Sequence, residues 1–188
     1  MKDLFTGDLV HLTAEDPETL AKLVSQWMGD SEYSRLLNWD PATVPSVKGV
    51  QKWIEKQFED DKTHSFAIRT LEGDAIIGEI GIDGINWTHG DAFVGIGLGD
   101  REYWGRGFGT DAMRIIERYA FTELNLHRLT LDVFEYNPRG IRSYEKAGFH
   151  IEGRERGVLM REGRRWDLIF MGILREEWLA QNRREDGV

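Results

Sequence analysis

The sequence predicts an α+β (mixed α/β) domain built on a central, largely antiparallel sheet. Apolar residues alternate with other residues in several short runs, which is typical of strands, and recur at helical spacing in several longer runs. In addition, three strand-like runs follow one another between residues 64 and 99, separated only by the turn-like segments "EGD" and "WTHGD". Such short connections favour antiparallel hairpins.

The order of the elements follows from these patterns. Seven strands are expected, at residues 8–14, 64–71, 75–86, 91–99, 127–137, 149–160 and 165–174. Four helices are expected, at residues 15–28, 47–61, 110–124 and 138–147. Segment 29–46 is expected to be irregular. No repeat or linker divides the chain, so residues 1–188 are interpreted as one domain, with a core at about 8–178 and a polar tail at 179–188.

The helix at 110–124 and the strand after it each have two distinct faces. Four apolar residues of the helix form a stripe for the core: Met113, Ile116, Ala120 and Leu124. Three charged residues are expected to face away from that stripe: Asp111, Arg114 and Arg118. On the strand, Asp132 lies on the face opposite Leu131 and Val133, which is consistent with a side chain that points into a cleft.

Composition excludes several classes of function. The 188 residues include no cysteine, which excludes disulfides, thiolate metal sites and a cysteine nucleophile. The five histidines show no ligand spacing, so no metal site is expected. A formal net charge of −9 argues against binding to nucleic acid or anionic membranes and mildly favours a cationic partner. With no signal-peptide-like start and no apolar run long enough to cross a bilayer, the chain is expected to be cytoplasmic.

The stretch Tyr103–Ala112, "YWGRGFGTDA", places three glycines between a strand and a helix. Glycine loses the most conformational freedom on folding, so some feature must compensate for Gly105, Gly107 and Gly109. One interpretation is an anion site, because bare backbone N–H groups at a helix N-terminus can approach a phosphate closely. The alternative is a tight turn that only permits close packing of helix on sheet. The spacing matches neither a P-loop nor the dinucleotide-binding fingerprint.

Together with the later segment "LNLHRLTLDVFEYNPRGIRSYEKAGF", this stretch resembles the acetyl-CoA core of the GNAT superfamily of N-acetyltransferases. The family motif is Gln/Arg-x-x-Gly-x-Gly/Ala, and residues 104–109 match it except that Trp104 stands at the first position. This form and the ending "REGRRWDLIFMGILREEW" are similar to the branch with ribosomal-protein N-terminal acetyltransferases and spermidine acetyltransferases. The resemblance covers about residues 8–178 and is strongest over 95–150.

The resemblance implies a twisted sheet of about seven strands that splays after the fourth strand, flanked by about four helices, with acetyl-CoA as cosubstrate in the slot. It implies that the backbone of Gly97, Leu98 and Gly99 binds the pantetheine arm as an added strand would. The pyrophosphate would be held by six consecutive residues: Gly105, Arg106, Gly107, Phe108, Gly109 and Thr110. Asn137 would contact the pantetheine or acetyl end.

The implied chemistry is direct transfer of an acetyl group to a primary amine. Tyr144 matches the family's general acid, and a tyrosine with an ordinary pKa of about 10 is protonated at neutral pH. The amine must lose a proton, so a carboxylate or a relay of waters is expected to act as base. Asp132 is one candidate base and Glu79 a second. Without the resemblance, Tyr144 would be read as a core aromatic residue and either carboxylate as a surface or hydrogen-bonded group.

The acceptor is expected to be a protein or peptide N-terminus or a small amine such as a polyamine. In the family, the segment around Tyr33, Leu36, Leu37 and Trp39 builds the acceptor wall. Trp39 is therefore a candidate substrate-binding residue, with a core position as the alternative, and Glu79 is a second candidate. The net charge fits a small cationic acceptor better than an acidic one.

Two further interpretations follow from the same residues. A non-catalytic acyl-CoA-binding sensor or interaction module is the alternative function, which the presence of both Asn137 and Tyr144 disfavours. Three basic residues near the phosphates are interpreted as solvent-exposed helix charges: Arg139, Arg142 and Lys146. If the strand at 165–174 ends the sheet, its edge needs a cover, and a homodimer is one way to provide it.

Overall fold

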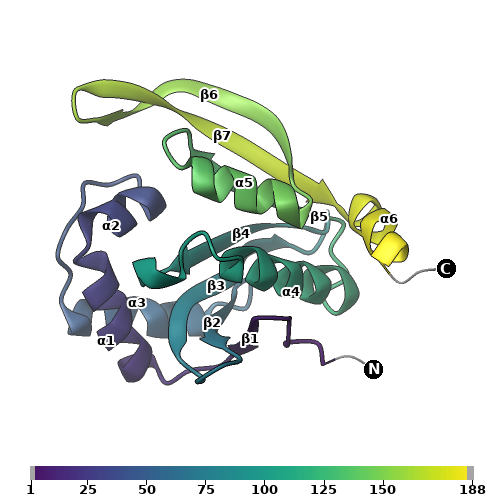
Figure 1. Ribbon diagram of the computed structural model, residues 1–188, viewed down its shortest axis with the longest axis horizontal. Helices are drawn as coiled ribbons and strands as arrows, with labels where there is room; N and C mark the ends of the chain where they lie inside the picture. Colours follow the sequence, from purple (N-terminus) through teal and green to yellow (C-terminus); the bar gives the residue numbers. More distant parts are fainter. Residues whose placement is uncertain (1–2, 186–188) are drawn as a thin grey trace.

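The computed structural model describes residues 3–185, and these form seven strands and six α-helices (Figure 1). The strands are β1 (Val10–Thr13), β2 (His64–Thr70), β3 (Ile76–Asn86), β4 (Asp91–Leu98), β5 (Arg128–Phe134), β6 (His150–Arg161) and β7 (Arg164–Leu174). The helices are α1 (Pro17–Met28), α2 (Ser31–Leu37), α3 (Val47–Glu59), α4 (Phe108–Thr122), α5 (Pro138–Ala147) and α6 (Arg175–Glu185). All the predicted strands and helices are present, and the mixed α/β class is confirmed.

Two of the helices lie where the sequence patterns predict none. α2 falls inside segment 29–46, and it begins where the Asp30 carboxylate accepts the backbone N–H of Glu32 at 2.9 Å. Its seven residues are too few to repeat an apolar stripe. α6 includes most of the segment predicted as a polar tail at 179–188, and residues 186–188 lie outside the described residues. Trp178 anchors α6 by packing on Phe121, with ring centroids 5.5 Å apart.

The sheet has the strand order β1-β2-β3-β4-β5-β7-β6. Neighbouring strands are antiparallel except β4 and β5, which run parallel. The parallel pairing joins only Asp91–Phe93 to Arg128–Thr130. Residues 94–98 of β4 and 131–134 of β5 continue as strands without pairing to each other. The predicted splay after the fourth strand is therefore confirmed, and it opens the sheet between its two halves.

The premise of the predicted homodimer is wrong. β7 does not end the sheet, because it pairs with β5 on one side and with β6 on the other. The outer edge on this side is β6, and the long β6–β7 hairpin extends across the top of the view in Figure 1. A repeat of short hairpins in the sequence does not reveal that a chain will insert its last strand between two earlier ones. Within residues 3–185 no helix is long and apolar enough to cross a membrane.

The two faces of the sheet are covered by different helices. On one face, Met113 of α4 lies in a single buried cluster with Ile80 and Ile82 of β3. On the other face, α1, α2 and α3 form a second cluster with Trp27 and Tyr33, and α3 lies behind the sheet in Figure 1. Because side chains alternate along a strand, the β3 residues between these isoleucines and on either side of them point away from α4. That second face therefore carries the acidic side chains of β3.

Asp111 does not face away from the core, contrary to the expectation. It is buried in the first turn of α4, and its carboxylate accepts backbone N–H groups of Asp8, Leu9 and Val10 at 2.8–3.1 Å. Arg118 on the same helix donates to main-chain carbonyls of the N-terminal segment, including that of Leu4 at 2.6 Å. Helical periodicity separates charged from apolar positions but cannot show that a charged side chain will bind backbone groups of a distant segment.

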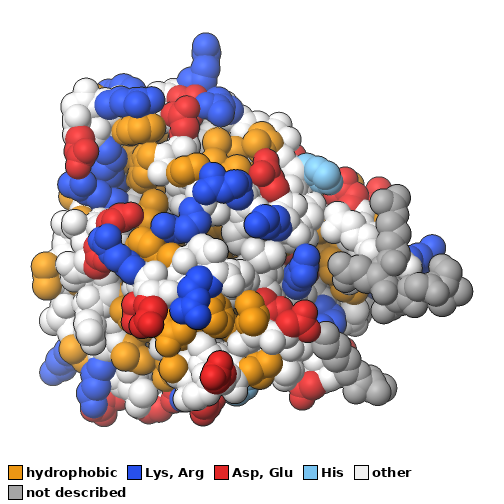
Figure 2. All heavy atoms as spheres, viewed as in Figure 1, with side chains coloured by type: hydrophobic (Ala, Val, Ile, Leu, Met, Phe, Trp, Pro, Cys, Tyr) orange, Lys and Arg blue, Asp and Glu red, His pale blue; other side chains and the backbone are white. Residues whose placement is uncertain are grey.

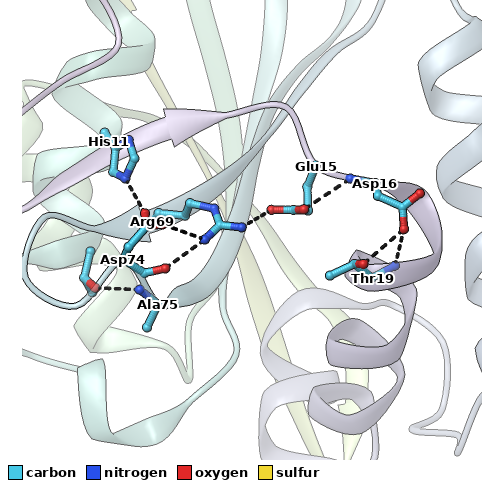
Figure 3. Close-up of polar contacts among 8 residues, drawn as sticks. His11, Glu15, Asp16, Thr19, Arg69, Asp74 and Ala75 are labelled. Carbon is cyan, nitrogen blue, oxygen red and sulfur yellow. Dashed lines mark hydrogen bonds and ion pairs between the residues drawn. The ribbon is translucent and has the colours of Figure 1, made fainter.

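A polar network fixes the β1 edge of the sheet (Figure 3). Arg69 of β2 pairs with Glu15, which follows β1, and with Asp74 in the β2–β3 turn. His11 of β1 contacts the same Asp74 carboxylate at 3.0 Å. Asp16 then caps α1 by accepting a backbone N–H of the first turn at 2.9 Å. These contacts set the point at which the chain leaves the sheet and enters α1.

Candidate active site

A cavity of about 470 Å³ lies at the opening between β4 and β5. Its walls come from the unpaired part of both strands, from α2, from the glycine turn before α4 and from α5. Nine of the predicted site residues line it: Gly97, Leu98, Gly105, Gly107, Gly109, Thr110, Asp132, Asn137 and Tyr144. Residues that are far apart in the sequence thus meet in one cavity.

The glycine turn leads directly into the N-terminus of α4. Gly105 and Gly107 have φ angles of +71° and +95°, which residues other than glycine rarely adopt. Gly107 is the N-cap of α4 and has no side chain that could cap the helix, so the first-turn N–H groups are free of a capping side chain. A Cβ built on Gly109 would lie 3.5 Å from Leu98 Cδ1 and 3.7 Å from Ser143 Oγ, that is, between β4 and α5. The turn thus has the backbone and the space for an anion.

Three of the predicted cofactor residues are not part of the cavity wall: Gly99, Arg106 and Phe108. Arg106 donates to the carbonyl of Glu102 at 3.2 Å and lies over the ring of Phe108. Phe108 in turn packs edge-on against Tyr103, with centroids 5.3 Å apart. A Cβ on Gly99 would collide with the ring of Trp27, at 1.8 Å, so this glycine is required by the packing of α1 on β4. The predicted roles of Arg106 and Phe108 depend on their backbone N–H groups.

Tyr144 and Asp132 both line the main cavity, and the charge of Asp132 acts on the Tyr144 hydroxyl. Burial raises the pKa of the Tyr144 hydroxyl to about 12, and the charge of Asp132 adds to that increase. The hydroxyl therefore stays protonated throughout the neutral range. Loss of solvent also raises the pKa of the Asp132 carboxyl above its usual range. The pair offers a proton donor and a carboxylate of increased basicity in one cavity.

Asn137 has a structural role in addition to its place in the cavity wall. Its side-chain oxygen accepts the N–H of Gly140 at 2.9 Å and so caps α5, as the sequence predicts. A Cβ at position 140 would lie 2.7 Å from Asn137 Nδ2, so a larger residue there would require the Asn137 side chain to shift. The cap orients the first turn of α5, which precedes Tyr144 by one to two turns.

Glu79 and Trp39 lie outside the wall of the main cavity. Glu79 is opposite Gly97 in the β3–β4 pairing and lines a separate cavity of about 20 Å³ with Phe58 and Ser65. Burial raises the pKa of Glu79 to about 7. Trp39 is 44% exposed and packs edge-on to Phe134, which does line the main cavity, with centroids 5.7 Å apart. The remaining predicted wall residues, Tyr33, Leu36 and Leu37, line the main cavity directly.

Asp83 is a cavity residue that the sequence analysis missed. It lies on β3 opposite Phe93, and Phe93 pairs with Thr130 of β5, two residues before Asp132. Asp83 is exposed to the open cavity, where partial loss of solvent raises the pKa of its carboxyl and the charge of Asp132 raises it further. An acidic residue within the apolar and glycine-rich run "IIGEIGIDGIN", at even spacing from Glu79, is the signal that could have identified it.

Basic residues of α5 line the same cavity, although the sequence analysis favoured their interpretation as solvent-exposed helix charges over contact with the phosphates. These are Arg139, Arg142 and Lys146, and Figure 2 shows Lys and Arg side chains gathered over α5. The Arg139 guanidinium lies 3.9 Å from the centre of the Trp104 ring. Loss of solvent lowers the pKa of Arg139, and repulsion by Arg101 and Arg142 adds to the decrease. The site thus has cationic groups that an anion would stabilise and, on β3 and β5, carboxylates that a cation would stabilise.

Known proteins are similar to this chain in sequence and in fold. Residues 8–150 match the family described as "Acetyltransferase (GNAT) domain". The spermidine N(1)-acetyltransferase of Escherichia coli (strain K12) is 30% identical over 154 residues, which cover 82% of this chain and 81% of that protein. The uncharacterized N-acetyltransferase p20 of Bacillus licheniformis is 29% identical over 181 residues, which cover 95% of this chain and 99% of that protein. The spermidine N-acetyltransferase of Vibrio cholerae, solved with CoA and spermine, has a TM-score of 0.80 at 24% identity, over 90% of this chain and 98% of that one.

Replacing Glu79 with Gln should stabilise the fold much more at pH 8 than at pH 5. The pKa of Glu79 rises from 4.5 to about 7 on folding, so the fold favours the neutral carboxyl group. The wild-type protein therefore loses stability relative to the variant as the pH rises from about 4.5 to 7, by at most about 3 kcal/mol. Urea unfolding at both pH values measures the difference. Glu72→Gln, at an exposed turn position, is the control, and an equal effect of Glu79→Gln at both pH values would contradict the expectation.

Proposed function

Because the chain belongs to the GNAT family of acetyltransferases, we propose that it acetylates a primary amine of a small cationic acceptor, with polyamines as the favoured class. The protein is an N-acetyltransferase with acetyl-CoA as cosubstrate. The observation that carries the proposal is the charge distribution of the cavity, which has basic residues on α5 and two carboxylates, Asp83 and Asp132, on the strands. Relatives named as spermidine acetyltransferases support the same acceptor class.

The glycine turn and the start of α4 fit the diphosphate of acetyl-CoA. When bound, acetyl-CoA supplies the acetyl group as a reactive thioester. The first-turn N–H groups of α4 and the positive end of the helix stabilise the phosphate charge. Gly97 and Leu98 of β4 line the cavity and have no strand paired on that side, so their backbone groups would bind the pantetheine arm of acetyl-CoA. Gly109 leaves room for the ligand at the point where a side chain would otherwise enter the cavity.

Tyr144 acts as the general acid in the proposed reaction. The departing sulfur of the thioester needs a proton, and the Tyr144 hydroxyl holds one at neutral pH because its pKa is about 12. Tyr144 lines the same cavity as Asn137, so its hydroxyl can approach the same acetyl-CoA molecule. A module that only bound acyl-CoA would not need a protonated hydroxyl at this position.

The carboxylates serve the acceptor. Asp132, directly or through water, accepts the proton that the ammonium must lose before attack, and its raised pKa makes it a better base than an ordinary aspartate. Asp83 is destabilised by the charge of Asp132, and a cation bound between the two carboxylates would remove that repulsion. An acceptor with two or more amino groups can place one ammonium beside Asp83 while another amine reacts beside Asp132.

Gly109→Ala should weaken acetyl-CoA binding without unfolding the protein. The new Cβ meets only ordinary contacts, at 3.5 Å or more, and alanine favours the helix, so the melting temperature should not fall. The methyl group enters the cavity between β4 and α5, so the KM for acetyl-CoA should rise about tenfold, equivalent to about 1.4 kcal/mol. Gly153→Ala on β6 is the matched control. Unchanged affinity for acetyl-CoA would mean that Gly109 serves only packing.

Tyr144→Phe should lower kcat by about 10²–10⁴-fold, because it removes the proton donor. Thermal stabilisation by acetyl-CoA should remain, since the phosphate site is intact. Tyr119→Phe, a half-buried tyrosine on the other side of α4 from the cavity wall, is the control. The assay follows thiol release with spermidine and with N-terminal peptides. Full activity of Tyr144→Phe would reject its role, and a wild-type protein that binds acetyl-CoA but acetylates no amine would instead be an acyl-CoA sensor.

Asp83→Asn should raise the KM for spermidine about tenfold and leave the KM for acetyl-CoA within about twofold. The variant removes one of the two charges that attract the acceptor but none of the groups near the glycine turn. Glu72→Gln removes the same charge far from the cavity and controls for the net charge of the protein. If both variants change the KM for spermidine equally, long-range attraction and not the carboxylate pair selects the acceptor.

A further inference from the structure

α2 bridges the opening between the two halves of the sheet. Its first turn is held to the β1–β4 half, because Arg101 pairs with Asp30 at 2.5 Å and with Glu32 at 2.6 Å. Tyr33 is buried in the cluster that α2 shares with α1 and α3. In Figure 1 the other end of α2 lies below the tip of the β6–β7 hairpin. A helix of seven residues is not stable alone, so its position depends on such contacts.

Arg161, at the end of β6, holds the segment that follows α2. Its Nη2 donates to the backbone carbonyls of Asn38, Trp39 and Asp40, at 3.1, 2.8 and 2.9 Å. Asn38 is the C-cap of α2, and a guanidinium is favoured there because the C-terminal carbonyls of a helix carry partial negative charge. One side chain thus binds three consecutive carbonyls that lie more than 120 residues away in the chain.

A second tether runs in parallel. The hydroxyl of Tyr136, just after β5, donates to the carbonyl of Arg35 at 2.6 Å. The guanidinium of Arg35 pairs with Glu162 in the hairpin turn at 2.8 Å. The Tyr136 ring stacks on Phe134, which lines the cavity, with centroids 5.2 Å apart. Both tethers join the C-terminal end of α2 to the β5–β7 half of the sheet.

The tethered segment forms part of the cavity wall. Leu36 and Leu37 line the cavity, and the ring of Trp39 packs edge-on to Phe134 from behind that wall. Loss of the Arg161 contacts would leave three carbonyls without their shared donor, and water in place of the guanidinium would not hold residues 38–40 against the hairpin. The wall that Leu36, Leu37 and Phe134 form would then widen.

We propose that Arg161 is a positioning residue that sets the affinity of the cavity for the acceptor. By holding residues 38–40 against the β6–β7 hairpin, it fixes the width of the cavity where the acceptor amine lies. Arg161 itself does not line the cavity and does not touch the reacting groups. The inference rests on the proposed function, because it assumes that the carboxylate-bearing part of the cavity receives an amine.

The test is a comparison of Arg161→Ala with the wild-type protein in steady-state kinetics. The KM for spermidine should rise about tenfold, while kcat changes less than about threefold and the KM for acetyl-CoA stays within about twofold. Arg165→Ala is the matched control, since Arg165 is an exposed arginine on the neighbouring strand of the same hairpin and lies outside the cavity wall. It should change none of the three values. A rise in both KM values, or no rise for spermidine, would overturn the proposal.

Hydrogen exchange supplies a readout that needs no acceptor. In Arg161→Ala, the amides of residues 36–40 should exchange faster, and those of α4 and β3 should keep their wild-type rates. Unchanged exchange at 36–40 overturns the proposal even if the protein acetylates amines, whereas a wild-type protein that acetylates no amine overturns the proposed function itself. Should Arg161→Ala not fold, Arg161→Lys and Tyr136→Phe replace it. Each removes part of the tethers, so each should raise the KM for spermidine to a smaller extent, and no rise in either would overturn the proposal.

Discussion

The early end of the pairing between β4 and β5 is the constraint on which the rest of the structure depends. These strands share only the three residue pairs from Asp91–Phe93 to Arg128–Thr130. Parallel strands that stayed paired would close the sheet, leaving no cavity and no backbone groups of β4 free to bind a ligand. The divergence of β4 and β5 therefore creates the cavity and leaves backbone groups of β4 unpaired. It also leaves two sheet halves that other contacts must hold in position.

The helices at the opening meet that requirement in different ways. α4 is fixed to the first half through Asp111, whose carboxylate accepts the backbone N–H groups of three consecutive residues before and in β1. α5 is oriented by the Asn137 cap and joined to α4 by the hydrogen bond between Thr110 and Ser143. α2 is held from both halves. The resulting cavity carries basic residues and carboxylates on different walls, which suits a phosphorylated donor and a cationic acceptor.

Much of the fold and part of the site could be predicted from the sequence. Strand alternation and helical stripes located all seven strands and four of the six α-helices in residues 3–185, because those patterns are set by neighbouring residues. α2 was missed because it is too short to repeat a stripe. Asp83 was missed although it shares a strand face with Glu79, because that spacing does not show which part of β3 borders the cavity. Glu79 was a candidate on the same strand, yet it lies beside a different, smaller cavity. Glu79 and Asp83 are four positions apart on β3, which is enough to place their side chains beside different cavities.

The sequence by itself determined the glycine turn, the helix cap and the position of Tyr144 in "NPRGIRSYEKAGF", and hence the family resemblance, since each is a short run whose geometry follows from its own residues. Only the tertiary structure decided that β7 lies between β5 and β6, that Asp83 joins Asp132, and that Arg161 holds the end of α2. These are contacts between segments tens to more than a hundred residues apart. Burial and hydrogen bonding stabilise such contacts in the folded chain. No local sequence pattern specifies which distant segment each one will contact.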